Sequence, residues 1–353
     1  MNNRRIRWTA FTAVSIACAY IAYLFFPTAF PIVSVDISMT RELAIEKALD
    51  LSHEHGWGPV IPQRDAASFE TNIPVKTFVE LEAGGIEGFA RLLEDSIFSP
   101  YTWRVRLFSE GVVNETTVRF RPNGRPYGFR EKIAEDEKRP NIDAAVAKEA
   151  VEAAAIDVWR IDLAGLELTE SGQDEKPNGR IDHRFVYESP RPGLGDGRLQ
   201  VRARVSGDRV SMFMPSVRVP ESFTRRYQEM RSANNSISTL GQVGMFLLLI
   251  VSGVGLYHLS RRGKLVWRPA IIAAGLIAAL QIAASLNTLP LAWLSYDTSD
   301  SASGFLIQTT LSSISSSLLF ALILALSFIA AEGLSRLAFP DHPQLWRLWS
   351  REA

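Results

Sequence analysis

Apolar residues gather into four long runs, and one extended polar stretch separates the first run from the other three. The runs cover residues 8–26, 240–258, 269–293 and 305–331, and the polar stretch covers residues 27–239. A helix needs about 20 consecutive, mostly apolar residues to cross a bilayer. The pattern therefore predicts four transmembrane α-helices, with the lipid bilayer as their partner, and one large polar domain between the first two.

The positions of lysine and arginine predict how these helices are oriented. Residues 1–7 and the loop 259–268 hold seven basic side chains: Arg4, Arg5, Arg7, Arg261, Arg262, Lys264 and Arg268. The loop 294–304 holds two aspartates and no basic residue, whereas the tail 332–353 holds three arginines. Cytoplasmic loops carry the excess of basic residues. We therefore expect both termini in the cytoplasm and the domain 27–239 outside it.

The first apolar run has two further interpretations, as a cleaved lipoprotein signal ending before Cys18 or as a twin-arginine signal at Arg4 and Arg5. The run continues to Phe26, which is longer than the apolar core of about 7–15 residues in a signal peptide. We therefore expect an uncleaved anchor. Cys18 is the chain's only cysteine, so neither an intramolecular disulfide nor a cysteine-based zinc site is possible.

The polar domain is predicted to be an α+β domain of two similar modules, at about residues 36–138 and 139–222. Each module begins with a helix, from Thr40 to Gly56 in the first and over 142–159, led by Asn141, in the second. Strands are expected at 103–108, 118–121, 127–130, 163–168, 184–188, 199–205 and 209–213, with a further strand and a short helix within 70–91. We expect each helix to pack on a small antiparallel sheet.

Two short segments carry the similarity between the modules. Val118-Arg119-Phe120-Arg121 and Val201-Arg202-Ala203-Arg204 both precede a turn, and the turn glycines Gly124 and Gly207 keep the same offset from the valines. Alternation of apolar residues with arginine is typical of a strand with one buried and one wet face.

Catalytic and cofactor motifs are not found in this sequence. His53 and His55 are expected at a solvated helix end, and Asp182 and His183 at polar strand positions, because neighbouring strand residues face opposite ways. Nucleic-acid binding needs a concentrated basic face, and the zero net charge gives no reason to propose one, so no nucleic-acid partner is expected. The serine cluster at 312–317 is typical of helix packing in membranes.

Glu332 is the one acidic residue near the end of the fourth run. The segment Ala331-Glu332-Gly333-Leu334-Ser335-Arg336 resembles the first motif of the CPBP (CAAX protease and bacteriocin-processing) intramembrane metalloproteases, which is two glutamates, three residues and an arginine. The stretches Val118–Phe129, Arg180–Glu188 and Val217–Glu221 are similar to the extracytoplasmic region of some large bacterial members. The resemblance implies a bacterial inner-membrane protein.

The sequence departs from that family in two places. Ala331 replaces the first glutamate, and the later histidine-bearing helices have no counterpart before Ala353. Glu332 and Arg336 are thus the only catalytic candidates. Because they lie four residues apart, a plain salt bridge is the alternative. No metal or cofactor is expected, with zinc only where a catalytic core is supplied elsewhere. The resemblance implies a non-catalytic N-terminal half that binds an extracytoplasmic ligand or polypeptide, with a membrane-protein partner.

Two other functions fit the same layout. FtsX/MacB-like membrane subunits of mechanotransmitting ABC systems share the plan of one span, a large external domain and three further spans. The short loop Ser260–Trp267 offers them little coupling surface. A membrane-anchored sensor is the other alternative, and Trp346 and Trp349 in the tail are then expected to lie in the headgroup region.

Overall fold

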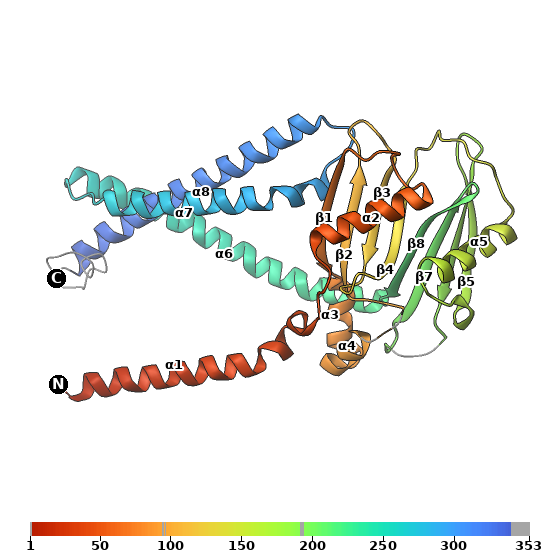
Figure 1. Cartoon of the computed structure of the whole chain (residues 1–353). Helices are drawn as coiled ribbons and strands as arrows, with labels where there is room; N and C mark the ends of the chain where they lie inside the picture. Colours follow the sequence, from red (N-terminus) through yellow and green to blue (C-terminus); the bar gives the residue numbers. More distant parts are fainter. Residues whose placement is uncertain (1, 94, 96, 191–193, 340–353) are drawn as a thin grey trace. The chain divides into compact units, whose positions relative to one another are not determined.

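The computed structural model describes residues 2–93, 95, 97–190 and 194–339, and the chain divides after Pro220 into two compact units. The first unit holds helix α1 (Asn2–Ala29) and a sheet domain, and the second holds the long helices α6, α7 and α8 (Figure 1). His342, Trp346 and Trp349 lie outside the described residues. The expectations for the end of the tail therefore stay predictions.

Eight strands form one antiparallel sheet in the order β1-β2-β3-β4-β8-β7-β6-β5. The strands are β1 (Arg64–Thr71), β2 (Tyr101–Phe108), β3 (Glu115–Phe120), β4 (Pro126–Lys132), β5 (Glu167–Glu175), β6 (Ile181–Glu188), β7 (Arg198–Ser206) and β8 (Arg209–Arg218). Helix α2 (Arg41–His55) precedes β1–β4, and helix α5 (Ala144–Asp157) precedes β5–β8. Each half of the sheet therefore consists of four strands preceded by one helix.

The two halves form one continuous sheet. The prediction that each module closes as a small sheet of its own is therefore wrong. Strand β4 pairs with β8, with Phe129 opposite Phe213 and Arg130 opposite Met212. The β3–β4 and β7–β8 hairpins occupy equivalent places in their halves, as the matching valine and arginine segments predict. Because β4 and β8 are the last strands of their halves, the sheet is continuous only through this seam.

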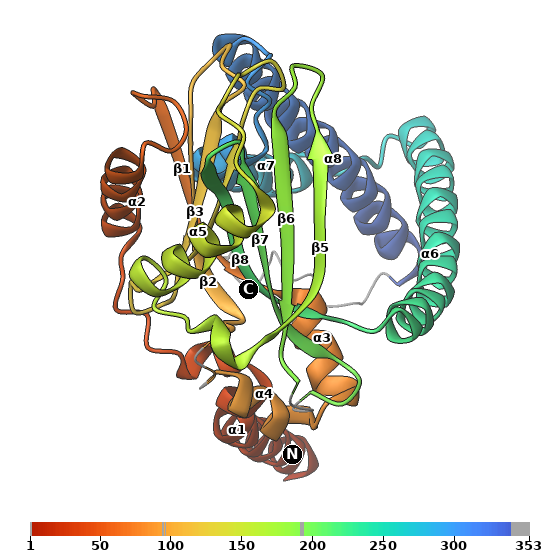
Figure 2. The same ribbon diagram turned by 90° about the vertical axis from the view of Figure 1, so that its right-hand side faces the viewer.

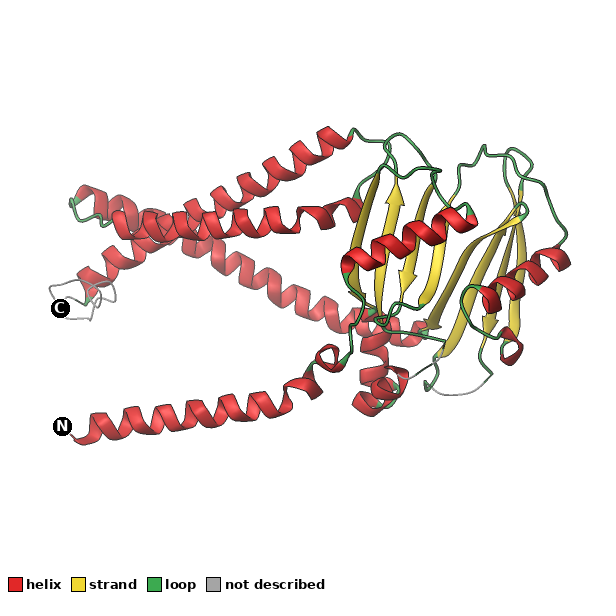
Figure 3. Cartoon of the chain, in the orientation of Figure 1, coloured by secondary structure: helices red, strands yellow, loops and turns green. Residues whose placement is uncertain are grey.

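Both helices cover the same face of the sheet, as Figures 2 and 3 show. Each buries a stripe of mostly small residues at four-residue spacing: Ala44, Ala48 and Ser52 in α2, and Ala147, Val151 and Ala155 in α5. Residues four apart share one face of a helix. The helix-covered side is the core, and its apolar cluster contains residues of both halves.

Four aromatic rings cross the seam between the halves. Trp57 follows α2 by two residues, Trp159 follows α5 by two residues, and Phe129 and Phe213 are the paired residues of β4 and β8. Ring centroids lie 3.8 Å apart for Trp57 and Phe129, 5.5 Å for Phe129 and Trp159, and 5.6 Å for Trp159 and Phe213. The stack therefore ties each helix end to the strand pair that joins the sheet.

Helix α2 has the boundaries that its sequence predicts. The Thr40 hydroxyl accepts a hydrogen bond from the amide of Leu43 (3.3 Å), and Gly56 ends the helix at φ 65°. A side-chain acceptor at the N-cap and a left-handed glycine at the C-terminus are the usual limits of a helix.

Two boundaries in the second half differ from the prediction. Helix α5 begins at Ala144, with Asp143 and not Asn141 at the N-cap. Asn141 instead accepts from the amide of Ile181 (2.8 Å) and donates to the carbonyl of Gly179 (2.8 Å). The strand expected at 163–168 is a 3₁₀ turn over Leu163–Gly165. Strand β5 follows at Glu167–Glu175, and all its side chains are exposed.

The segment 70–91 contains more helix than the prediction allowed. Strand β1 ends at Thr71, and helices α3 (Ile73–Glu82) and α4 (Gly85–Leu93) follow it before β2. The Asn72 side chain caps α3 by accepting from the amide of Val75 (3.3 Å).

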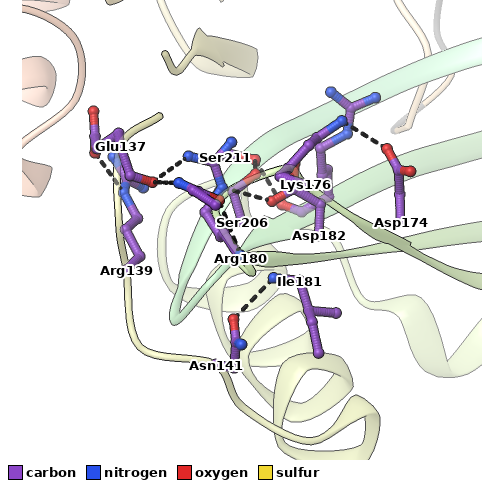
Figure 4. Close-up of polar contacts among 12 residues, drawn as sticks. Glu137, Arg139, Asn141, Asp174, Lys176, Arg180, Ile181, Asp182, Ser206 and Ser211 are labelled. Atoms are coloured by element: carbon purple, nitrogen blue, oxygen red, sulfur yellow. Dashed lines mark hydrogen bonds and ion pairs between the residues drawn. The ribbon is translucent and has the colours of Figure 1, made fainter. Parts of the chain in front are cut away.

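A buried polar network holds the linker between the halves (Figure 4). Arg180 is only 3% exposed, and its Nε donates to Asp182 (3.0 Å). Its Nη1 donates to the main-chain carbonyls of Ala134 (2.9 Å) and Glu137 (2.7 Å). The Glu137 carboxylate in turn accepts from Arg139 (2.7 Å). Buried charges need such partners, so the network fixes the path of the linker.

In the part of the chain that the structure describes, four helices are long and apolar enough to cross a membrane. They are α1, α6 (Glu221–Arg261), α7 (Arg268–Ala292) and α8 (Ala302–Ala338). Helices α7 and α8 pack through small residues, Ala274 and Ala278 against Ala321 and Ala325. Helix α6 starts well before the apolar run 240–258, and at about 1.5 Å per residue its polar part, Glu221–Thr239, is about 28 Å long.

We predict that Phe213→Ala lowers the free energy of unfolding of the sheet domain by about 3–5 kcal/mol, because a buried ring is lost at the seam. Urea unfolding of the detergent-solubilised chain, followed by tryptophan fluorescence, measures the effect. Ile61→Ala is the control, since Ile61 is 79% exposed and its loss is expected to change stability by no more than about 0.5 kcal/mol. Equal losses in the two variants would contradict the role of the stack.

We also predict that Glu137 makes the sheet domain less stable in acid. Burial raises the pKa of Glu137, but hydrogen bonds from Asn114 and Arg139 and the charges of Arg139 and Arg180 outweigh burial, so the pKa lies below its usual value. The stabilisation is present above the unfolded-state pKa of about 4.3 and is lost as pH falls through the lower folded-state pKa. Glu137→Gln should flatten this acid limb in a series of unfolding curves, whereas an unchanged limb would refute the assignment.

Candidate functional site

On the face of the sheet opposite α2 and α5, arginines of three strands, β4, β6 and β7, lie close together. Side chains alternate between the two faces of a strand, so the residues between the core positions Phe129, Phe185, Val201, Ala203 and Val205 point to this open face. The arginines there are Arg130 on β4, Arg184 on β6, and Arg202 and Arg204 on β7. Three are exposed, and Arg204 is half-buried.

The strand register brings these arginines together. Arg184 lies directly opposite Arg204, and Met212 lies opposite both Arg204 and Arg130. Like charges directly opposite each other on neighbouring strands are destabilising. The row Arg184–Arg204–Met212–Arg130 therefore concentrates positive charge across strands β6, β7, β8 and β4.

A groove of about 1020 Å³ runs along this face. The arginines line it together with Met212, Met214 and Ser216 of β8 and the edge strand β5. Both methionines are half-buried, so their thioethers form an apolar floor among the guanidinium groups. Methionine side chains are flexible and polarizable and adapt to different contacts. The groove thus combines positive charge with an adaptable apolar surface.

The groove arginines have no carboxylate partner among the described residues. No hydrogen bond or ion pair joins Arg130, Arg184 or Arg204 to a carboxylate of the described residues. Arg202 lies beside Gln200. With the Gln200 amide turned so that its oxygen faces Arg202, Nη2 of Arg202 donates to this oxygen at 3.0 Å. A planar guanidinium binds a carboxylate or a phosphate through two parallel hydrogen bonds. These groups are therefore available to an anion from outside the chain.

Two carboxylates border the groove on β5. Glu170 lines it directly. Asp174 pairs with Lys176 (2.6 Å), and this hydrogen bond, with the positive charge of Lys176, holds the pKa of Asp174 below its usual value. The charges of Arg184 and Arg204 lower that pKa further. Asp174 thus feels the positive field of the groove while its own contact is with Lys176.

The open face of strands β2 and β3 is different, because its arginines are paired within the chain. Arg104 and Arg119 both contact Glu70 at 3.3 Å, and Arg106 pairs with Glu115. Arg104, Arg106 and Arg119 thus differ from the groove arginines on β4, β6 and β7, which have no carboxylate partner among the described residues.

The predicted candidates Glu332 and Arg336 form an ion pair within α8. Arg336 Nε donates to Glu332 Oε1 at 2.7 Å, which is the salt bridge of the alternative interpretation. No group of three or more metal-ligating side chains occurs among the described residues.

The histidines and the membrane serines have structural contacts. His183 is buried with Nε2 2.8 Å from the carbonyl of Ile142, and the neighbouring Asp182 pairs with Arg180. His53 lies in the last turn of α2, and the ring of His55 stacks on Trp57 at 4.7 Å. Ser317 donates to the carbonyl of Ser313 (2.8 Å) in its own helix.

Comparison with known proteins adds nothing to these observations. No family model matches the chain, and neither a curated protein nor a solved structure matches it. The resemblance to the CPBP family, drawn from short motifs, stays a prediction.

The sequence analysis singled out two of the groove arginines, but it did not predict that they belong to a binding site. Arg202 and Arg204 stand in the segment that revealed the repeat, where their alternation indicated a wet strand face. Arg130 and Arg184 lie far from them in sequence, and only the pairing of β4 with β8 and of β6 with β7 brings the four together. One signal in the sequence could have indicated the site: three predicted strands carry arginine, and not a neutral polar residue, at positions expected to face solvent.

We predict that neither the wild-type protein nor Glu332→Ala holds stoichiometric zinc. Glu332 already pairs with Arg336, and no histidine or carboxylate cluster accompanies it among the described residues. Elemental analysis of the purified, full-length, detergent-solubilised chain measures the metal content, with Arg336→Ala as a matched change in the same pair. Zinc that is bound by the wild type and lost in Glu332→Ala would contradict the prediction and reopen the metalloprotease interpretation.

Proposed function

We propose that this chain is a multi-pass protein of a bacterial inner membrane that binds an extracytoplasmic ligand or polypeptide and does not itself catalyse a reaction. The binding surface in this proposal is the open face of strands β4, β8, β7, β6 and β5. The observation that carries it is the groove, whose arginines lack carboxylate partners among the described residues. Such a surface is complementary to a ligand that brings its own negative charge.

The membrane part of the proposal is supported by the long helices. Apolar side chains along them are exposed, for example Leu240 at 71%, Ile272 at 72% and Leu276 at 62%. Exposed apolar residues over such lengths are favourable in lipid and costly in water. The connection between α6 and α7 is short and basic, which supports a cytoplasmic location for it and an external location for the sheet domain.

The same proposal includes the accessory role that the CPBP resemblance implies. Its support is the Glu332–Arg336 motif and the similar stretches in the sheet domain. The ion pair within α8 and the lack of a metal-ligand cluster among the described residues favour binding over hydrolysis. The mechanotransmitting alternative would need a coupling surface larger than the six residues between Arg261 and Arg268.

Single cysteines in a Cys18→Ser background test both parts of the proposal. Glu170→Cys in the groove and Val146→Cys on the exposed side of α5 should react with a membrane-impermeant maleimide added to spheroplasts. Lys264→Cys, between α6 and α7, should react only after permeabilisation. Bound ligand should slow labelling of Glu170→Cys in cells relative to the purified protein, whereas Val146→Cys should react alike in both.

Two results would refute the proposal. Labelling of Lys264→Cys from outside would reverse the orientation. Equal labelling rates of Glu170→Cys in cells and in the purified protein would mean that the groove is unoccupied in its native membrane.

A further inference from the structure

The charge in the groove is spread over a distance that one small ion cannot cover. Strands β6, β7, β8 and β4 are neighbours in the sheet, and at about 4.8 Å per strand their arginines extend over about 14 Å. Arg184 and Arg204 face each other directly, so an anion between them relieves the repulsion of two like charges. A ligand with several negative charges is therefore the best complement to the whole row.

The remaining lining of the groove indicates what carries those charges. Met212 and Met214 lie among the arginines and offer apolar contact, which a purely phosphate-based ligand would leave unused. Arg202 and Arg204 are two residues apart on β7, and this interval is about 6.8 Å. In an extended polypeptide, side chains on one face recur at the same interval. An extended chain that runs along β7 with acidic residues at every second position thus matches Arg202 and Arg204, and its apolar residues can contact the methionines of the neighbouring β8.

Strand β5 borders one end of the groove. It is the last strand of the sheet and has a neighbour on one side only, β6. All of its side chains are exposed, so those on the open face are accessible to a ligand in the groove.

We propose that the groove between β5 and β4 binds an extended, acidic segment of a polypeptide. Its carboxylates pair with Arg184, Arg204, Arg202 and Arg130, and its apolar side chains contact Met212 and Met214. This inference rests on the proposed function, since it names the chemical class of the ligand that the open face receives.

The test uses the full-length, detergent-solubilised chain and a short fluorescein-labelled peptide that alternates glutamate with leucine. Fluorescence anisotropy measures binding, which should weaken steeply with added salt because the charges lie at an exposed surface. Arg184→Gln and Arg204→Gln should each weaken peptide binding about tenfold or more. Arg204→Lys should bind more tightly than Arg204→Gln but more weakly than the wild type, because an ammonium group cannot form the bidentate pair. Arg125→Gln, an exposed arginine in the β3–β4 turn, is the matched control and should bind as the wild type does.

Thermal melting separates loss of binding from loss of folding. Without peptide, Arg184→Gln and Arg204→Gln should melt at the wild-type temperature or above it, because one of two opposed charges is gone. With peptide, the melting temperature should rise for the wild type and for Arg125→Gln only.

Three outcomes would overturn the inference. A peptide that alternates lysine with leucine and binds equally well would exclude charge recognition. Displacement of the acidic peptide by inorganic phosphate, or by vesicles of an anionic phospholipid, would assign the groove to phosphate chemistry. Failure of the peptide to bind while Glu170→Cys remains protected in cells would refute this ligand class and leave the proposed function intact.

Discussion

The pairing of β4 with β8 is the interaction on which the rest of the sheet domain depends. Phe129 and Phe213 face each other across this seam, and Trp57 and Trp159 stack on them from the ends of the two helices. Stacked rings of this size bury much apolar surface. The seam thus turns two four-stranded halves, each with one exposed inner edge, into a single sheet with one shared core.

The same seam creates the candidate site on the opposite face. Because side chains alternate, the residue next to Phe129 in β4, Arg130, must point away from the core. Pairing with β8 then sets Arg130 beside Met212, and the register of β7 and β6 extends the row to Arg204 and Arg184. Core packing on one side and charge concentration on the other are therefore two results of one strand register.

The arginines of the open face have different partners in different parts of the sheet, and this explains where the candidate site lies. On β2 and β3, Glu70 and Glu115 neutralise the arginines, which leaves a structural network. On β4, β6 and β7 the groove arginines have no carboxylate partner among the described residues, and Asp174 on β5 pairs with Lys176. One part of the open face thus supports the sheet, and the other presents guanidinium groups to a partner.

Local patterns in the sequence determined the four apolar helices, the limits of α2 at Thr40 and Gly56, and the equivalence of the two hairpins, because length, capping and alternation act over a few residues. Only the tertiary structure decided the rest. Strand β5 has no buried side and hence no alternation to read, and the joining of the halves depends on hydrogen bonds between β4 and β8, more than eighty residues apart. The groove arginines come from three strands of which two are distant in sequence, so their convergence follows from that long-range pairing and from no local motif.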